Sequence, residues 1–250
     1  MNRWRRIPGY VGAAAVLLAG WWVVSAIIAS PALPSPELAI ADFVRLWRSE
    51  LWPQLLVSAW RVGISMLIAL VIAAPLGLLI GRARRLDALA APLIYLSYPI
   101  PKIVLLPVLL VLFGIGDAPK IALITLILFF QMLVTARDAA RNIPDGPLLS
   151  MRSLGATRGQ IFRHVVVPAA LPDLFTALRV SSGTAIAVLF FSESVAGVSG
   201  LGYYIMDAWS RIAYSEMFAG IIAMALLGVV IYELLDAAEA RLCRWTRAGR

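Results

Sequence analysis

Six apolar stretches, each close to the length needed to cross a lipid bilayer, constrain the fold of this chain more than any other feature. They cover residues 10–29, 55–80, 88–113, 120–134, 173–191 and 219–235. About 20 helical residues span the hydrocarbon core, and lipid-embedded backbone must satisfy its polar groups internally. With 61% hydrophobic and 14% charged residues, the sequence predicts an all-α membrane protein. We expect residues 1–250 to form a single domain of six transmembrane helices.

The distribution of arginine predicts the orientation of these helices. The predicted cytoplasmic segments hold fifteen arginines, and the clearly external ones hold three, Arg45, Arg48 and Arg211. Positive charge concentrates on the cytoplasmic side of membrane proteins, so both termini are expected inside. The rule also explains the net charge of +8 without a nucleic-acid partner. The basic start Asn2–Arg6 followed by residues 10–29 resembles a signal peptide, but no clear cleavage site precedes Pro31, and we interpret it as an uncleaved first span.

Two segments between the spans are expected outside the membrane on the external side. From Glu37 to Trp52, apolar residues recur at helical spacing and tryptophans suit the headgroup region. The pattern predicts an amphipathic helix lying on the external surface; a structureless connector is the alternative. Residues 192–218 are predicted to form the second external segment.

The third apolar stretch is interrupted by the sequence Tyr98-Pro99-Ile100-Pro101-Lys102. Two closely spaced prolines break a helix, and a membrane tolerates broken backbone only where protein or water covers it. The sequence therefore predicts a lined cavity, with Tyr98, Pro99, Pro101 and Lys102 on a translocation pathway. An ammonium at this depth favours an anion; the alternative is that Lys102 pairs with a carboxylate such as Glu193 or extends to the membrane interface.

The fifth stretch carries a small polar patch of three hydroxyl residues, Ser181, Ser182 and Thr184. Hydroxyl groups can line a water-filled path, although small residues at such positions also permit close helix packing. Glu193 follows at the outer end of the stretch, where it is predicted to control access to the cavity. Arg179 is interpreted as a residue of the cytoplasmic interface.

The longest polar and basic segment is residues 137–172. Its residues 148–162 favour two short helices that meet at a turn near Gly155 and Gly159, and Pro172 is expected to open the next span. Such a segment between two spans is a suitable contact for a soluble cytoplasmic partner, although it could be a solvated connector.

This segment resembles the cytoplasmic loop of ABC importer permeases, whose pattern is Glu-Ala-Ala, three residues, Gly, nine residues, Ile-x-Leu-Pro. Gly155 and Pro168 match the second half, with Val165 and Val167 in place of Ile and Leu, whereas Leu149, Ser150 and Met151 occupy the Glu-Ala-Ala positions. The resemblance implies a coupling helix that docks on an ATP-hydrolysing subunit. The residues it assigns to that contact are Leu149, Ser150, Met151, Arg152, Gly155, Ala156, Thr157, Arg158 and Pro168.

Two further motifs extend the resemblance to the nitrate, sulfonate, taurine and bicarbonate branch of these permeases. They are Tyr98–Lys102 leading to Phe113-Gly-Ile-Gly116, and Glu193 followed by Ser199-Gly-Leu-Gly-Tyr203. The resemblance implies the type I importer fold in the bacterial cytoplasmic (inner) membrane, a homodimer of permeases, two ATPase subunits and a periplasmic or lipid-anchored binding protein. The expected function is transport of a small anionic solute, such as a sulfonate, taurine or nitrate.

No GxxxxGK[ST] phosphate loop occurs in the chain, so ATP and Mg are expected in the partner ATPase and no cofactor in this chain. Two other classes remain open. An intramembrane enzyme needs paired carboxylates, a metal set or a Ser/Lys dyad, and the chain has only His164 and Cys243 for metal ligation by His or Cys. A secondary carrier working without an ATPase is disfavoured by the absence of an obvious internal repeat and by the large basic loop.

Overall fold

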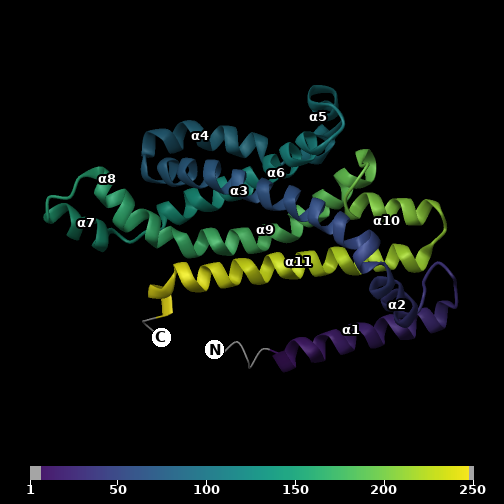
Figure 1. The fold of residues 1–250 in the computed structure, drawn as a ribbon. Coiled ribbons are helices and arrows are strands. Elements are labelled where there is room, and N and C mark those ends of the chain that lie inside the picture. The colour runs from purple at the N-terminus through teal and green to yellow at the C-terminus, as the bar shows by residue number, and fades with distance from the viewer. Residues whose placement is uncertain (1–6, 248–250) are drawn as a thin grey trace.

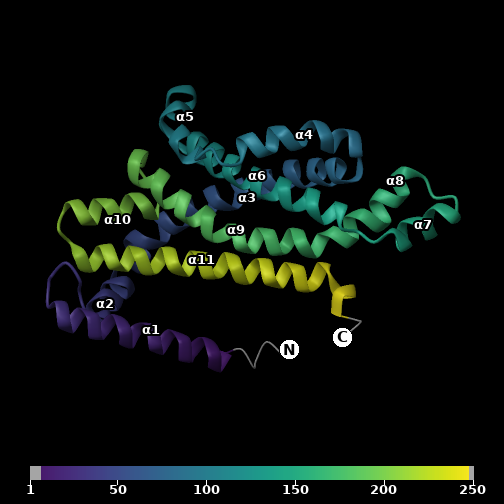
Figure 2. The ribbon, with the colours of Figure 1, turned by 180° about the vertical axis from the view of Figure 1, so that it is seen from behind.

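The computed structural model describes residues 7–247, which are helical without strands. The predicted basic start, Asn2–Arg6, and Arg250 lie outside the described residues. Long helices run side by side and form the body of the molecule (Figure 1). They are α1 (Ile7–Ile28), α3 (Trp52–Arg82), α6 (Asp117–Arg141), α9 (Val167–Ala196) and α11 (Tyr214–Leu242). The two ends of the described chain lie toward the end of this body that carries α7 (Asp145–Ser153) and α8 (Arg158–Ile161), as the reverse view also shows (Figure 2).

Shorter elements connect or extend these helices. They are α2 (Pro36–Leu46), the π-helical turn η2 (Trp47–Leu51), α4 (Arg84–Ser97), the 3-10 turn η3 (Lys102–Leu105), α5 (Leu106–Phe113), the π-helical turn η4 (Phe162–Val166), α10 (Leu201–Ser210) and the 3-10 turn η5 (Arg244–Arg247). In the described part of the chain, four continuous helices are long and apolar enough to cross a membrane, or five if the bent pair α4 and η3–α5 counts as one span.

The centre of the body is the contact between α3 and α6, which small residues make possible. A Cβ atom at Gly77 would lie 2.5 Å from the carbonyl oxygen of Leu133, and one at Gly81 would lie still closer to that of Arg137. Ala136 and Ala140 complete the α6 side and are fully buried. Because lipid provides no hydrophobic drive between helices, such close backbone approach is a main source of attraction.

Two of the predicted boundaries between segments are wrong. The amphipathic helix expected over Glu37–Trp52 does form, but Pro36–Arg82 is one continuous helix through η2. Pro53 lies inside this continuous helix, directly after the π-helical turn η2, and does not interrupt it. Pro172 does not open the fifth span: the helix runs from Arg158 through η4 to Ala196, and Pro172 lies inside it.

Other helices extend past the predicted apolar stretches. The predicted cytoplasmic segment 137–172 begins inside α6, which ends only at Arg141, and the predicted external segment 192–218 contains the end of α9 and all of α10. Apolar composition marks the lipid-facing length of a helix, whereas the backbone remains helical until a cap or turn ends it. Composition alone therefore placed the ends too early.

The predicted interruption of the third apolar stretch is confirmed. The helix breaks after Ser97, and α4 and η3–α5 meet at an angle of 78°. A turn follows α5, with Gly114 at φ +74°.

Candidate functional site: a buried charge cluster, a polar cavity and an exposed helical hairpin

A cluster of buried charges lies at the end of the body opposite α7 and α8. Arg61 of α3 is 2% exposed, and Glu193 of α9 and Lys120 of α6 are 0% exposed. Arg61 Nη1 donates to Glu193 Oε1 at 2.7 Å, and its Nε donates to Asp117 Oδ1 at 2.8 Å. The Lys120 ammonium donates to the carbonyl oxygen of Gly116 at 2.8 Å. Two buried cations and the buried Glu193 thus share one site with Asp117, whose side chain is 50% exposed, and the opposite charges limit the cost of burial.

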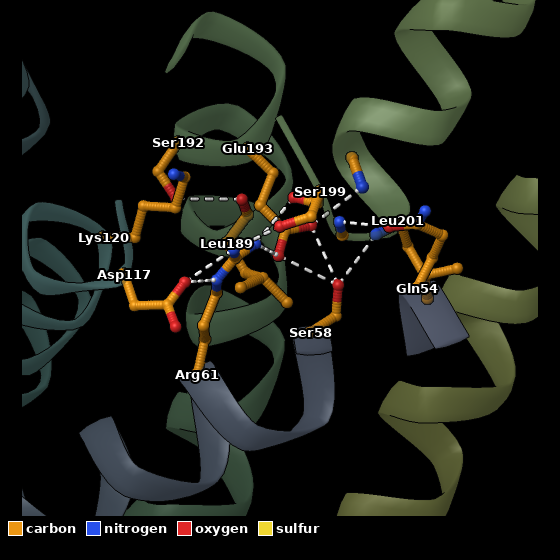
Figure 3. Close-up of polar contacts among 12 residues, drawn as sticks. Gln54, Ser58, Arg61, Asp117, Lys120, Leu189, Ser192, Glu193, Ser199 and Leu201 are labelled. Atoms are coloured by element: carbon orange, nitrogen blue, oxygen red, sulfur yellow. Dashed lines mark hydrogen bonds and ion pairs between the residues drawn. The ribbon is translucent and has the colours of Figure 1, made fainter. Parts of the chain in front are cut away.

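The cluster also holds the chain between α9 and α10. Arg61 donates to the carbonyl oxygen of Ser199 at 2.7 Å and to its hydroxyl at 2.8 Å. The Glu193 carboxylate accepts from Gly202 N at 2.8 Å and from the Ser58 hydroxyl at 2.9 Å. Figure 3 shows Arg61 and Ser58 projecting from α3 toward Glu193 and the backbone around Ser199 and Leu201.

A glycine allows the chain between α9 and α10 to pass this close to Glu193. Gly200 adopts φ +105°, and a Cβ atom there would collide with the Glu193 carboxylate. Its amide donates to Gln54 Oε1 at 2.6 Å, and the next amide, of Leu201, donates to Ser58 Oγ at 2.8 Å. Residues 199–202, which lead into α10, are therefore fixed by side chains of α3 and α9.

The prediction that Glu193 controls access to a cavity is not tested by these contacts, but the proposed pairing of Lys102 with Glu193 is absent: Glu193 pairs with Arg61. Sequence reasoning missed Arg61, Gln54 and Ser58. The sequence does contain a signal for these three residues, because positions 54, 58 and 61 share one helical face. A polar stripe on one face of an apolar span indicates a buried polar contact.

A polar cavity of about 580 Å³ lies between α6 and α9 beside the helix break. It brings together two of the predicted pathway residues, Tyr98 and Ser181, with further polar groups from α6 and α9. The polar members of its lining are Tyr98, Gln131, Thr135, Asp138, Asn142, Asp173, Thr176 and Ser181. Gln131 Oε1 is buried there without a hydrogen-bond partner among the described residues.

The other predicted pathway residues lie elsewhere. Ser182 is on the opposite side of α9, in a largely apolar groove of about 1430 Å³ beside α1 and α11. Pro99 lines a separate cavity of about 640 Å³ under α4. Thr184 is partly buried and Pro101 is exposed. Arg179, interpreted as an interface residue, pairs with Asp236 and Glu239 at 2.7 Å each, beside the wide groove.

Helices α7 and α8 form an exposed hairpin at the other end of the body, as Figure 1 shows. The hairpin turns at Gly155, which has φ +76°. Gly155 N donates to Arg152 O and Ala156 N donates to Met151 O, which is the Schellman pattern that ends helices at glycine. Thr157 and Gln160 then form a reciprocal capping box that begins α8.

The surface of this hairpin carries unpaired apolar side chains. Leu149 is 56% exposed and Leu154 is 82% exposed, whereas Leu148 is buried against the body. The predicted turn near Gly155 is confirmed, but only α7 is a short helix, because α8 continues through η4 into α9. The turn presents apolar groups to its surroundings. Among the described residues, no group of three or more His, Cys, Asp or Glu could hold a metal ion.

Comparisons with known proteins agree with this architecture. Residues 73–247 match the family described as binding-protein-dependent transport system inner membrane component. The taurine transport system permease protein TauC of Escherichia coli K12 is 31% identical, over 97% of this chain and 92% of that protein. The putative aliphatic sulfonates transport permease protein SsuC of Bacillus subtilis is 29% identical, over 92% of this chain and 85% of its own length.

A solved structure shares the fold. An inward-facing structure of the MetNI methionine ABC transporter superposes with a TM-score of 0.65 at 23% identity, covering 77% of this chain and 95% of that chain. The chain therefore belongs to the family of binding-protein-dependent transport system inner membrane components, as a multi-pass permease subunit of a type I ABC importer.

Proposed function

We propose that two copies of this chain form the translocation pathway of an ATP-driven importer in the bacterial inner membrane. In this proposal each copy crosses the membrane six times with both termini in the cytoplasm, α7 and α8 are the coupling helix segment, and the buried charge cluster lies on the external side. The observation that carries the proposal is the exposed hairpin of α7 and α8 in a chain of this family.

The hairpin has the properties of a docking element for a soluble ATPase. Its turn is fixed at Gly155 by two backbone hydrogen bonds and at Thr157 by the capping box, so it can transmit a displacement without deforming. Its exposed Leu149 and Leu154 supply apolar area for an interface. One hairpin per chain requires two ATPase subunits for two permeases, and these subunits would bind ATP and Mg.

One continuous helix joins the hairpin to the far end of the molecule. The helix that begins at Arg158 continues as α9 to Ala196 and carries Glu193 near its end. A helix of 39 residues is about 58 Å long, so movement of the hairpin would be delivered to the buried charge cluster. This supports alternating access driven by nucleotide binding in the partner subunits.

The proposed solute is a small sulfonate-type molecule delivered by a periplasmic or lipid-anchored binding protein, in line with the printed functions of TauC and SsuC. The polar cavity refines this expectation. Its lining includes the carboxylates of Asp138 and Asp173 and, within the described residues, no lysine or arginine. Such a lining favours a solute that carries an ammonium group, as taurine does, over a simple anion.

Co-purification tests the assembly directly. The tagged chain, extracted from its host in mild detergent, is expected to retain an ATPase in equal number, and the complex in liposomes with the host's binding protein is expected to hydrolyse ATP faster with taurine. Recovery of the chain alone under several mild conditions, together with taurine uptake that needs no ATP, would favour a secondary carrier instead.

Substitution at the hairpin turn tests the coupling role. Gly155→Val forces a branched side chain to φ +76°, which costs about 1–2 kcal/mol and distorts the turn. We expect ATP hydrolysis to continue while uptake falls. Gly159→Ala is the matched control, because a Cβ atom at Gly159 has no atom within 4 Å. Normal coupled uptake in the Gly155 variant would contradict the docking role.

A further inference from the structure

The break between α4 and η3 leaves backbone oxygens that lack their usual donors. In a continuous helix the amide of residue 101 would donate to the carbonyl oxygen of Ser97, but Pro101 has no N–H. The turn also releases the carbonyl oxygens of Tyr98 and Ile100 from regular helix geometry. The Ser97 oxygen keeps one long backbone bond, from Ile100 N at 3.3 Å. Carbonyl oxygens without regular helix donors are costly in a membrane, and three of them gather at this break.

The side chain of Lys102 satisfies all three. Its Nζ donates to the carbonyl oxygens of Ser97 at 2.7 Å, Tyr98 at 3.0 Å and Ile100 at 3.2 Å. An ammonium has three N–H groups, so none remains for an anion in this arrangement. The ring of Phe130, on α6, lies 4.4 Å from Nζ and adds a cation–π contact. The broken segment is thus built around a cation that the chain itself supplies.

This arrangement fixes the position of Tyr98. This residue lines the polar cavity between α6 and α9 and also the cavity of about 640 Å³ under α4. Tyr98 and Val134 line both cavities, so Tyr98 stands where the two adjoin, and its own carbonyl oxygen is held by Lys102. A shift of this backbone would move the tyrosine ring out of the shared wall.

We propose that Lys102 is a positioning residue whose ammonium fixes the helix break and thereby holds Tyr98 as the gate between these two cavities. This inference rests on the proposed function, because the gate acts on a solute only if the polar cavity is part of the pathway. The sequence predicted that Lys102 attracts an anion directly, whereas in this proposal the same charge has a structural role. Tyr98, at the wall, is then the group that contacts the passing solute.

Chemical rescue tests the tether. Lys102→Ala removes Cγ, Cδ, Cε and Nζ, which together correspond to n-propylammonium. The full chain is prepared with Cys243→Ser and Tyr98→Cys, so that residue 98 carries the only thiol. We expect Lys102→Ala to lower the midpoint of thermal unfolding and to change the rate of methanethiosulfonate labelling at residue 98 several-fold. Millimolar n-propylammonium chloride should restore both values.

The controls separate this effect from general stabilisation by salt. Tetramethylammonium has the same charge but no N–H group and should restore neither value. Lys120→Ala removes another buried lysine of the neighbouring helix and should leave labelling at residue 98 unchanged. Lys102→Arg keeps a donor cation, so we expect it to fold without additive and to give an intermediate labelling rate. A poorly folding alanine variant therefore does not prevent the test. Unchanged labelling in both Lys102 variants, or equal rescue by the two ammonium ions, would overturn the proposal.

Uptake of radiolabelled taurine tests the gate separately. In the assembled importer, Tyr98→Ala and Lys102→Met are expected to reduce or uncouple uptake, and Tyr98→Phe, which keeps the ring, to retain most of it. Normal uptake in Tyr98→Ala would overturn the gating role. If the wild-type importer took up neither taurine nor other sulfonates, the proposed function would fail, while the labelling and melting results would still decide the role of Lys102.

Discussion

Removing one partner of the buried Arg61–Glu193 pair is the most direct test of how the start of α3 is joined to the end of α9. Arg61→Met leaves the Glu193 carboxylate in a site that is 0% exposed, where Ser58 and Gly202 are its remaining donors within residues 7–247. Glu193→Gln keeps the shape and the bond from Gly202 but leaves Arg61 with Asp117 as its one carboxylate. Both variants leave a buried charge undercompensated.

The magnitude follows from the burial of the pair. Breaking a buried ion pair by removing one partner costs about 3–5 kcal/mol. For a chain of this length each kcal/mol lowers the midpoint of thermal unfolding by about 2–4 °C, so we expect a fall of about 6–20 °C. The double variant Arg61→Met with Glu193→Gln removes both charges and is expected to lose less than the sum of the singles, by about 1–3 kcal/mol.

The assay is thermal unfolding of the purified chain in one detergent, followed by the fluorescence of a thiol- or tryptophan-based reporter. Arg45→Met is the matched control, because Arg45 is 63% exposed and pairs with Asp42 and Glu216 on the surface. Such pairs contribute at most about 1 kcal/mol. Equal small shifts for Arg61→Met and Arg45→Met, or strictly additive single effects in the double variant, would refute the assigned role of the cluster.

Three further predictions use single substitutions or reagents. Gly81→Leu should separate α3 from α6 and lower the unfolding midpoint sharply, whereas Gly63→Leu on the open side of α3 should not; comparable midpoints would argue against close packing. Tyr204→Phe removes a buried hydroxyl that has no hydrogen-bond partner among the described residues, and should be neutral or stabilising by up to about 1 kcal/mol; a marked loss would reveal a missing partner. Burial raises the pKa of the Cys243 thiol, so maleimide should label the native chain slowly at neutral pH and faster as the pH rises. Full labelling is expected only after denaturation in SDS. Rapid labelling of the native chain would contradict the burial of this thiol.

The parts of the fold that could be predicted are those with a local cause. The prolines at positions 99 and 101 remove amides wherever they stand, and the break at Ser97 follows from them. Gly155 followed by Thr157 and Gln160 predicts a helix stop and a helix start within a few residues, and both are present. Such signals do not depend on what the segment packs against.

The parts that could not be predicted depend on distant neighbours. Nothing near Lys102 in the sequence distinguishes an ammonium that faces a pathway from one that caps its own backbone, because the choice depends on where residues 97–100 turn. The polar stripe at positions 54, 58 and 61 indicates a buried contact, but the partner of Arg61 could not be predicted, since Glu193 is 132 residues away. Pro172 was given too much weight, because helices in membranes continue through proline when other groups cover the break.

The separation of Arg61 and Glu193 along the chain has a consequence for biosynthesis. At translation rates of about 5–20 residues per second, 132 residues correspond to roughly 7–26 s. During that time α3 has left the ribosome while α9 has not, so Arg61 is inserted without its main partner. An arginine at a helix centre costs about 2.5–3.5 kcal/mol, which is an upper bound for Arg61 because it lies in the first third of α3. Asp117 arrives after only 56 residues, and it is the first carboxylate able to neutralise this arginine while the rest of the protein is still being made.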